Sequence, residues 1–163
     1  MSCTGVGLIG EGRSLNCVAD LVRATFRIFG ENFDPDAVSD WLGLAPTKIH
    51  RNGDPKPGAA RWEERYGEAP TPYREGAWLL STEDYLDADA RKPIDELLEL
   101  LEPRRDEFQR LIESGCFLDI FVFWPNHVGH GGPSLDASQM LRMGALGISI
   151  SWDIYESDEA RDF

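Results

Sequence analysis

The sequence predicts an α+β domain with a four-stranded, largely antiparallel sheet and helices on one face. One pattern predicts most of this: a strand, a polar loop and a helix opened by Asp-Ala occur twice, from Phe26 to Leu44 and from Phe121 to Leu146. A further strand follows each copy, and a helical segment lies between the two halves. Without this helical insertion each half reads strand, helix, strand, which is typical of a ferredoxin-like split fold.

Length and composition limit the number of domains. The 163 residues, 42% of them hydrophobic, are enough for one core but not for two, since domains cluster near roughly 100–150 residues. We therefore expect a single domain over residues 21–157, with an N-terminal extension over 1–20 and an acidic tail over 158–163.

The first half begins with a strand, because side chains alternate in character over residues 24–30. Asp34 and Pro35 then supply an N-cap acceptor and a proline at the first helical position, and Gly43 ends the helix. Residues 47–76 are rich in proline, glycine and charge, which predicts a long segment with little regular structure.

The remaining elements are predicted in this order: a strand over 77–82, a helical segment over 92–114, a strand over 117–124, a helix that ends at 146 and a strand over 147–155. Pro103 removes a helix hydrogen bond, so the helical segment is either one kinked helix or two short helices, the second starting at Pro103. We expect the two Asp-Ala helices to lie side by side on the sheet. If the helical insertion forms a crossover, the strand order differs from the ferredoxin-like one.

A longer motif combines several of these elements. It consists of the strand from Ala24, the Asp-Pro helix, the segment Leu-Gly-Leu-Ala-Pro-Thr that ends at Thr47, and a Gly-Ala-Trp strand that starts at Gly76. In this order the chain resembles family 4279 of the domains of unknown function, a bacterial family, over about residues 23–156. The resemblance implies a fold and a bacterial origin, but no reaction, because it includes no catalytic motif.

Charge favours one class of partner. The chain carries 29 acidic and 16 basic residues, a formal net charge of −13 at pH 7. This charge repels phosphate backbones and anionic lipid surfaces, so we expect no nucleic acid and no membrane as a partner, and a basic protein instead. The acids are concentrated over residues 83–113, where the alternatives are a docking surface and an ordinary solvated helix face.

The three cysteines indicate a reducing compartment. They lack the C-x-x-C spacing of a metal site, and their odd number argues against a complete set of disulfides. No segment approaches the roughly 20 apolar residues of a membrane span. We therefore expect a cytoplasmic protein, and we assign no cofactor.

One face of the predicted sheet has no helix over it and combines aromatic with short polar side chains. We expect this face to bind a partner through the following residues: Arg27, Phe29, Asp119, Phe121, Phe123, Asp153 and Tyr155. Such a surface is too apolar to face only water. A homodimer formed through this face and a cover formed by residues 55–76 are the alternatives.

A glycine-rich loop is the second candidate site. It holds His127 and His130, followed by Ser134 as the expected N-cap and Asp136 in the first helical turn. Imidazoles with a carboxylate can bind a divalent metal, and a helix start can bind an anion through backbone N–H groups. His50 would approach this loop if a pseudo-two-fold axis relates the halves. The spacing matches no known metal motif, so a structural loop is the alternative and we assign no metal ligand.

These observations lead to two functional hypotheses. The first is a non-enzymatic acidic interaction protein that binds a basic partner protein, as an immunity or antitoxin-like protein does. The second is a small-ligand or metal-binding domain, in one form a metal-dependent hydrolase, centred on the loop of His127 and His130. We favour the first because the chain is small and strongly acidic, because one sheet face combines aromatic with polar side chains, and because the sequence shows no constellation of a nucleophile with a base and no carboxylate pair.

Overall fold

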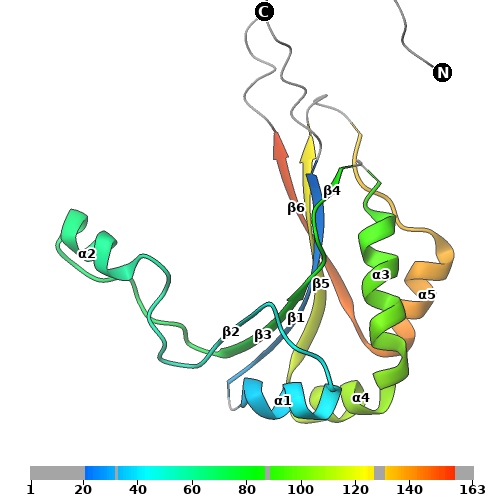
Figure 1. The fold of residues 1–163 in the computed structure, drawn as a ribbon, viewed down its shortest axis with the longest axis horizontal. Helices are drawn as coiled ribbons and strands as arrows, with labels where there is room; N and C mark the ends of the chain where they lie inside the picture. Colours follow the sequence, from blue (N-terminus) through cyan, green and yellow to red (C-terminus); the bar gives the residue numbers. More distant parts are fainter. Residues whose placement is uncertain (1–20, 32, 87–88, 127–130, 157–163) are drawn as a thin grey trace, which may run out of the picture.

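The computed structural model describes residues 21–31, 33–86, 89–126 and 131–156 (Figure 1). Its elements are β1 (Leu21–Gly30), α1 (Pro35–Leu42), β2 (Lys48–His50), α2 (Ala59–Tyr66), β3 (Gly76–Ser81), β4 (Tyr85–Leu86), α3 (Arg91–Leu101), η1 (Glu102–Arg104), α4 (Arg105–Glu113), β5 (Phe117–Asn126), α5 (Ala137–Leu146) and β6 (Ser149–Glu156). The predicted extension over 1–20 and tail over 158–163 lie outside the described residues.

One sheet runs through the molecule in the order β2-β3-β1-β5-β6, and β4 pairs with the start of β1. β1 runs antiparallel to β3 and β5, β2 runs antiparallel to β3, and β5 runs parallel to β6. The predicted α+β class is confirmed. The predicted count of four strands is too low, because β2 and β4 add two short strands, and the parallel β5–β6 pair makes the sheet mixed.

The two strand-helix-strand halves differ in how their strands pair. β1 and β2 both run antiparallel to β3, so they are parallel to each other with β3 between them. In the second half β5 and β6 are parallel and pair directly, with α5 as the crossover. The predicted first half has β3 as its second strand, but β3 pairs directly and antiparallel with β1, so the split unit is β1-α1-β2 instead. The second half is not split, and the ferredoxin-like prediction is therefore corrected. β2 is not predicted from the sequence because it is three residues long and opens a segment rich in proline and glycine.

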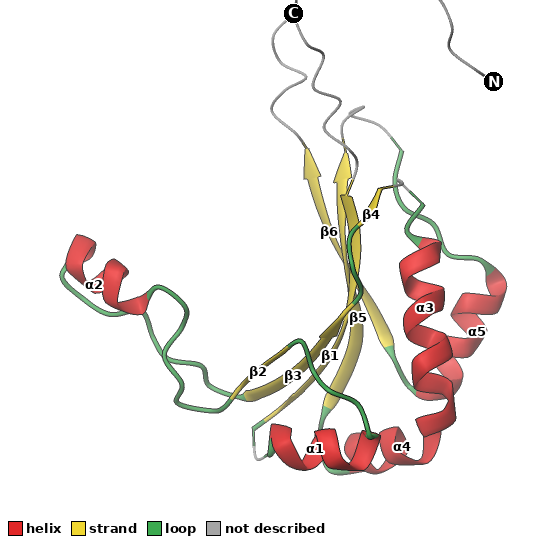
Figure 2. Ribbon diagram, in the orientation of Figure 1, coloured by secondary structure: helices red, strands yellow, loops and turns green. Residues whose placement is uncertain are grey.

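Four helices, α1, α3, α4 and α5, cover one face of the sheet (Figure 2). Phe26 is central to the core beneath them, with its ring centroid 6.2 Å from that of Trp78 and 5.4 Å from that of Phe108. Burial of each such side chain contributes roughly 1.5–3 kcal/mol. Figure 1 places α4 between α1 and α5, and α5 contacts α3 and α4, so the predicted side-by-side packing of the Asp-Ala helices is wrong. No helix among the described residues is long and apolar enough to cross a membrane.

The helical insertion is interrupted at Pro103. α3 ends at Leu101, the 3₁₀ turn η1 contains Pro103, and α4 begins at Arg105 rather than at the proline. The alternative with two short helices is therefore correct. The interruption allows Leu101 of α3 and Phe108 of α4 to enter the same core.

The segment predicted to have little regular structure contains β2 and α2. We call residues 51–75 the arm, because they leave the sheet between β2 and β3 and project from the body (Figure 1). Two backbone hydrogen bonds join its sides, from the N–H of Gly53 to the carbonyl oxygen of Tyr73 at 2.8 Å and from the N–H of Tyr73 to that of Asp54 at 3.0 Å. No residue of α2 is buried, so this helix contributes nothing to the core.

Candidate functional site

Two glycines at the ends of β1 and β3 leave room for an aromatic side chain. Gly30 and Gly76 are partners in the strand register. A Cβ atom on Gly76 would lie 2.8 Å from Cδ1 of Phe33 and 3.2 Å from its carbonyl oxygen, and one on Gly30 would lie 3.1 Å from Cβ of Phe33. Phe33 therefore packs directly against the strand ends and forms the first wall of a cleft.

Helix α1 forms the second wall, and polar contacts fix its position. The side chain of Asp34 caps the helix by accepting a hydrogen bond from the N–H of Asp36 at 3.1 Å. The indole N–H of Trp78 donates to the hydroxyl of Ser39 at 2.9 Å and ties α1 to β3. As a result Trp41, which is 61% exposed, stands at the edge of the cleft.

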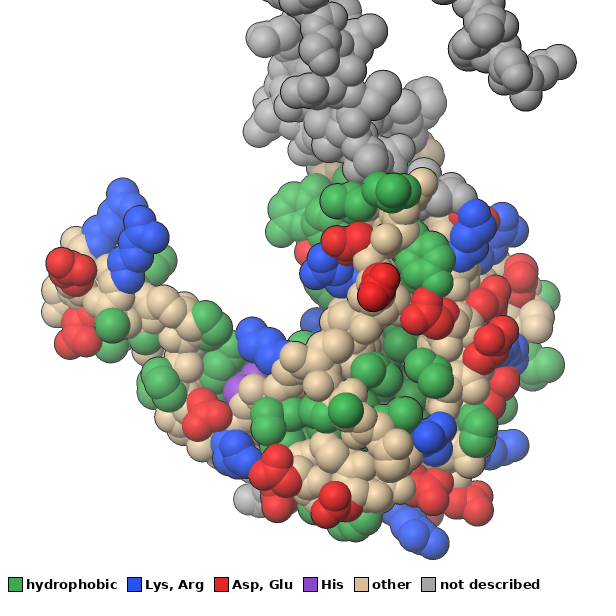
Figure 3. Space-filling view, in the orientation of Figure 1, with side chains coloured by type: hydrophobic (Ala, Val, Ile, Leu, Met, Phe, Trp, Pro, Cys, Tyr) green, Lys and Arg blue, Asp and Glu red, His purple; other side chains and the backbone are tan. Residues whose placement is uncertain are grey.

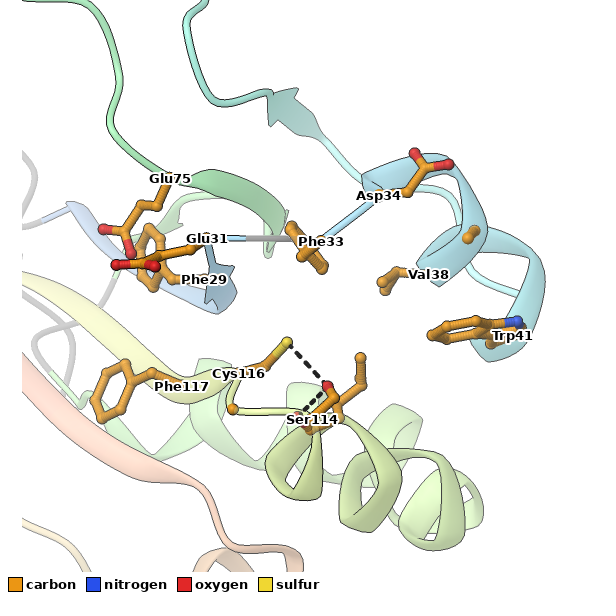
Figure 4. Close-up of a pocket in the computed structure, with 14 residues that line it drawn as sticks. Phe29, Glu31, Phe33, Asp34, Val38, Trp41, Glu75, Ser114, Cys116 and Phe117 are labelled. Carbon is orange, nitrogen blue, oxygen red and sulfur yellow. Dashed lines mark hydrogen bonds between the residues drawn. The ribbon is translucent and has the colours of Figure 1, made fainter.

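The turn from α4 to β5 forms the opposite wall. Gly115 has a φ of 90°, a conformation that favours glycine. The hydroxyl of Ser114 donates to the carbonyl oxygen of Leu111 at 2.7 Å and lies 3.6 Å from the sulfur of Cys116 (Figure 4). This turn presents Phe117, which is 53% exposed.

The space between these walls is a cleft of about 670 Å³ (Figure 4). Four of its lining residues are aromatic and three are acidic: Phe29, Phe33, Trp41 and Phe117, and Glu31, Asp34 and Glu75. None of its described lining residues is a lysine, arginine or histidine. Figure 4 shows Glu31 and Glu75 on the side of Phe29, and Asp34 on the side of α1. We call this the aromatic–acidic cleft.

The side chains of the cleft provide a site that can bind a cation. Ser114 and Cys116 are potential nucleophiles, but no imidazole or amine in the described lining is available to take their proton. The hydroxyl of Ser114 is also engaged with the backbone. Carboxylates and aromatic faces together attract cations, because both present negative charge density to the ligand.

The centre of the open sheet face holds a buried ion pair next to the cleft. Arg27 donates to both carboxylate oxygens of Asp119, from Nε at 2.8 Å and from Nη2 at 2.5 Å, and Ser151 donates to the same carboxylate at 2.8 Å. The guanidinium carbon lies 4.2 Å from the ring centroid of Phe121 and 5.1 Å from that of Phe29. Asp119 is 1% exposed and Arg27 is 22% exposed at their side chains. The face therefore holds a guanidinium with a carboxylate and two aromatic rings.

The residues predicted to bind a partner do lie on one face. Arg27 is opposite Asp119, and Phe123 is opposite Asp153, so the side chains in each pair point the same way from the sheet. The same alternation places Phe29 and Phe121 with them. Tyr155 extends the surface at β6, with its ring centroid 5.4 Å from that of Phe123. Their shared placement is confirmed, and their role in binding stays a prediction.

The arm does not lie over the open face, in contrast to the alternative of a cover formed by residues 55–76. The base of the arm contacts the sheet, where the ring of Tyr73 stacks on that of His50 with the centroids 3.6 Å apart, and Tyr73 shares a hollow with Phe29. Beyond this point Figure 3 shows the arm standing off from the body, with open space between them. Trp62 and Tyr66 on α2 have their ring centroids 4.4 Å apart, and both side chains are exposed.

The structure describes only part of the predicted histidine site. His127 and His130 lie outside the described residues. Asp136, not Ser134, is the N-cap of α5, because its side chain accepts from the N–H of Gln139 at 2.8 Å in a capping box; Ser134 is an exposed residue before the helix. Among the described residues no group of three His, Cys, Asp or Glu side chains could hold a metal ion.

His50 occupies the β2 edge of the open face. Burial, and to a lesser degree the charge of Lys48, lower the pKa of His50, while Asp54 and Glu75 oppose the shift. Its Nδ1 atom is buried without a hydrogen-bond partner. The neutral ring is therefore favoured in the folded protein.

Part of the negative charge over residues 83–113 is already paired. Arg142 of α5 donates to Glu102 at 2.6 Å and to Asp95 at 2.9 Å. The hydrogen bond from Arg142 lowers the pKa of the Glu102 carboxyl. By contrast, Glu31 and Glu75 in the aromatic–acidic cleft form no ion pair with any residue that the structure describes.

This cleft is not among the sites predicted from the sequence. Of its aromatic and acidic residues only Phe29 was among the predicted site residues. The others come from the loop after β1, from α1, from the end of the arm and from the start of β5, and only the fold brings these segments together. The available signal was the pair of glycines at the strand ends, Gly30 and Gly76, since a glycine in a sheet often marks the close approach of another group.

The comparisons with known proteins agree with the resemblance. The family model described as "Domain of unknown function (DUF4279)" matches residues 20–157. No match to the chain is found among curated proteins or among solved structures.

Proposed function

The chain belongs to the DUF4279 family, and we propose that it is a non-enzymatic binding protein for a basic partner protein. The observation that carries this proposal is the aromatic–acidic cleft, in which three carboxylates and four aromatic side chains line one cavity with no cation in its described lining. The net charge of −13 adds long-range attraction for a positive surface, which speeds association. An immunity or antitoxin-like role, in which the chain covers a basic toxin, fits these properties.

The open sheet face extends the proposed interface. Phe29 and Phe117 are directly opposite in the β1–β5 register, and both line the cleft. A partner that enters the cleft can therefore continue over Phe121 and Phe123 to Tyr155, which is 55% exposed. Aromatic side chains of this kind supply much of the binding energy in protein interfaces.

We place the encounter in the reducing environment of the cytoplasm. Cys116 is a free cysteine at the rim of the cleft, and a free thiol beside a binding surface is best preserved where thiols stay reduced. The partner would then be a cytoplasmic protein or one that enters this compartment.

Affinity capture from a lysate of the native host tests the proposal. The wild-type chain is compared with the double variant Glu31→Gln/Glu75→Gln and with the control Glu99→Gln/Asp106→Asn, which removes the same charge from exposed positions on α3 and α4. The proposal expects a protein of high isoelectric point that the wild type and the control enrich and the cleft variant loses. A partner that is acidic, or one that the cleft variant captures as well as the wild type, would contradict it.

A further inference from the structure

We infer that the aromatic–acidic cleft receives the guanidinium group of one arginine side chain of the basic partner. The inference rests on the proposed function and adds the chemical group that the cleft recognises. It starts from a guanidinium that the molecule already binds, its own Arg27.

Arg27 shows how this part of the sheet holds a guanidinium. Its Nε and Nη2 atoms donate in parallel to the two oxygens of Asp119, and its carbon lies 4.2 Å from the ring centroid of Phe121 and 5.1 Å from that of Phe29. A planar guanidinium satisfies both requirements at once, because it forms two parallel hydrogen bonds to a carboxylate and presents a flat face to aromatic rings. Lysine, a point charge, satisfies them less well.

The cleft repeats these groups without the cation. Phe29 lines the cleft as well as contacting Arg27, and Glu31 and Glu75 lie on the same side of the cavity (Figure 4). Trp41 and Phe117 add two exposed aromatic rings at its rim. Neither glutamate has an ion-pair partner among the described residues, so a bidentate acceptor and aromatic faces are both available to a ligand.

Positive side chains lie beside the cleft but not in its described lining. Arg51, beyond the α1 side, is bound to Asp36. On the arm side Lys56 and Arg74 share a neighbouring hollow with Glu75. Because like charges repel, a cation is disfavoured beside Lys56 and Arg74 and favoured by the carboxylates of the cleft lining. The volume of about 670 Å³ accommodates an arginine side chain together with part of the segment that carries it.

Titration of the 163-residue chain with small probes, followed by two-dimensional ¹H–¹⁵N NMR at low ionic strength, tests the inference. The probe is N-acetyl-arginine methylamide. N-acetyl-citrulline methylamide, its neutral isostere, and N-acetyl-lysine methylamide are the comparisons. We expect the arginine probe to shift the indole signal of Trp41 and the amides of Glu31 and Phe117, the citrulline probe to shift none of them, and the lysine probe to bind more weakly.

The matched variants make the result specific to the cleft. Glu31→Gln/Glu75→Gln is expected to weaken the arginine probe by at least about tenfold, whereas Glu99→Gln/Asp106→Asn leaves its affinity unchanged. Equal binding of citrulline or lysine, shifts spread evenly over α3 and α4, or an unchanged affinity in the cleft variant would each overturn the inference. The spectra of the variants also report their folding. Because no partner protein is needed, failure here combined with cleft-dependent capture of a basic partner would refute arginine recognition while leaving the proposed function supported.

Discussion

The ion pair at the centre of the open face leads to the most quantitative prediction. Asp119 is almost fully buried and accepts two hydrogen bonds from Arg27 and one from Ser151. Asp119→Asn keeps the shape of the side chain but removes its charge, so the guanidinium remains on the sheet without its counter-ion. Loss of one member of a fully buried pair costs roughly 3–5 kcal/mol. Because Arg27 is 22% exposed and retains some hydration, we expect about 2–4 kcal/mol.

Urea unfolding measures this cost. We expect Asp119→Asn to lower the urea concentration at the unfolding midpoint. The slope of the unfolding free energy against urea concentration should change little, because the variant changes stability and not the surface exposed on unfolding. Asp153→Asn on the same face is the control, since Asp153 forms no ion pair with a described residue, and its effect should stay within about 0.5 kcal/mol.

A double variant measures the interaction energy between Arg27 and Asp119 separately from their other contacts. Arg27→Met/Asp119→Leu removes both charges. We expect its loss of unfolding free energy to be smaller than the sum of the losses for Arg27→Met and Asp119→Leu alone, because no unpaired charge is left on the sheet. If Asp119→Asn is as stable as the wild type, or if the two single effects simply add, the described geometry does not hold a coupled ion pair.

Three further predictions concern the fold around the site. Gly76→Ala should destabilise the protein by about 1–3 kcal/mol in urea unfolding because the new methyl group would meet Phe33, whereas Gly132→Ala, with no atom within 4 Å of its new Cβ, should change little. Asp136→Ala should cost about 1 kcal/mol through loss of the α5 cap, and a variant as stable as the wild type would refute the capping role. The pKa of His50 is lowered in the folded state below its ordinary value of 6.5, so the unfolded chain binds the proton more readily and stability falls as the pH drops below about 6.5. His50→Gln should remove part of this fall, and identical pH dependence of the unfolding midpoints would show that His50 does not contribute.

Local patterns in the sequence determine several elements that could be predicted. Asp34 caps α1 and Gly43 ends it at a φ of 60°, both as the residue types require. The period of two over β1 and β6 placed the open-face residues correctly, because alternate side chains must share a face. Pro103 indicated the interruption between α3 and α4, since proline cannot continue a helix.

The rest depends on contacts between distant segments. β2 pairs with β3 although the whole arm separates them in the sequence. A strand as short as Lys48–His50 also has no periodicity by which to predict it. The parallel pairing of β5 and β6 depends on where α5 returns the chain, which the strand pattern does not specify. The aromatic–acidic cleft joins Glu31 and Glu75, which are brought together by the pairing of Gly30 with Gly76.

The central claim is that a basic partner binds through the aromatic–acidic cleft. The most direct measurement is the dissociation constant of the purified partner for the wild type and for Glu31→Gln/Glu75→Gln, obtained by isothermal titration calorimetry at two salt concentrations. We predict that the variant binds at least about tenfold more weakly and with a smaller dependence on salt, because two charges facing the partner are gone. Equal affinity and equal salt dependence for the two proteins would contradict the claim.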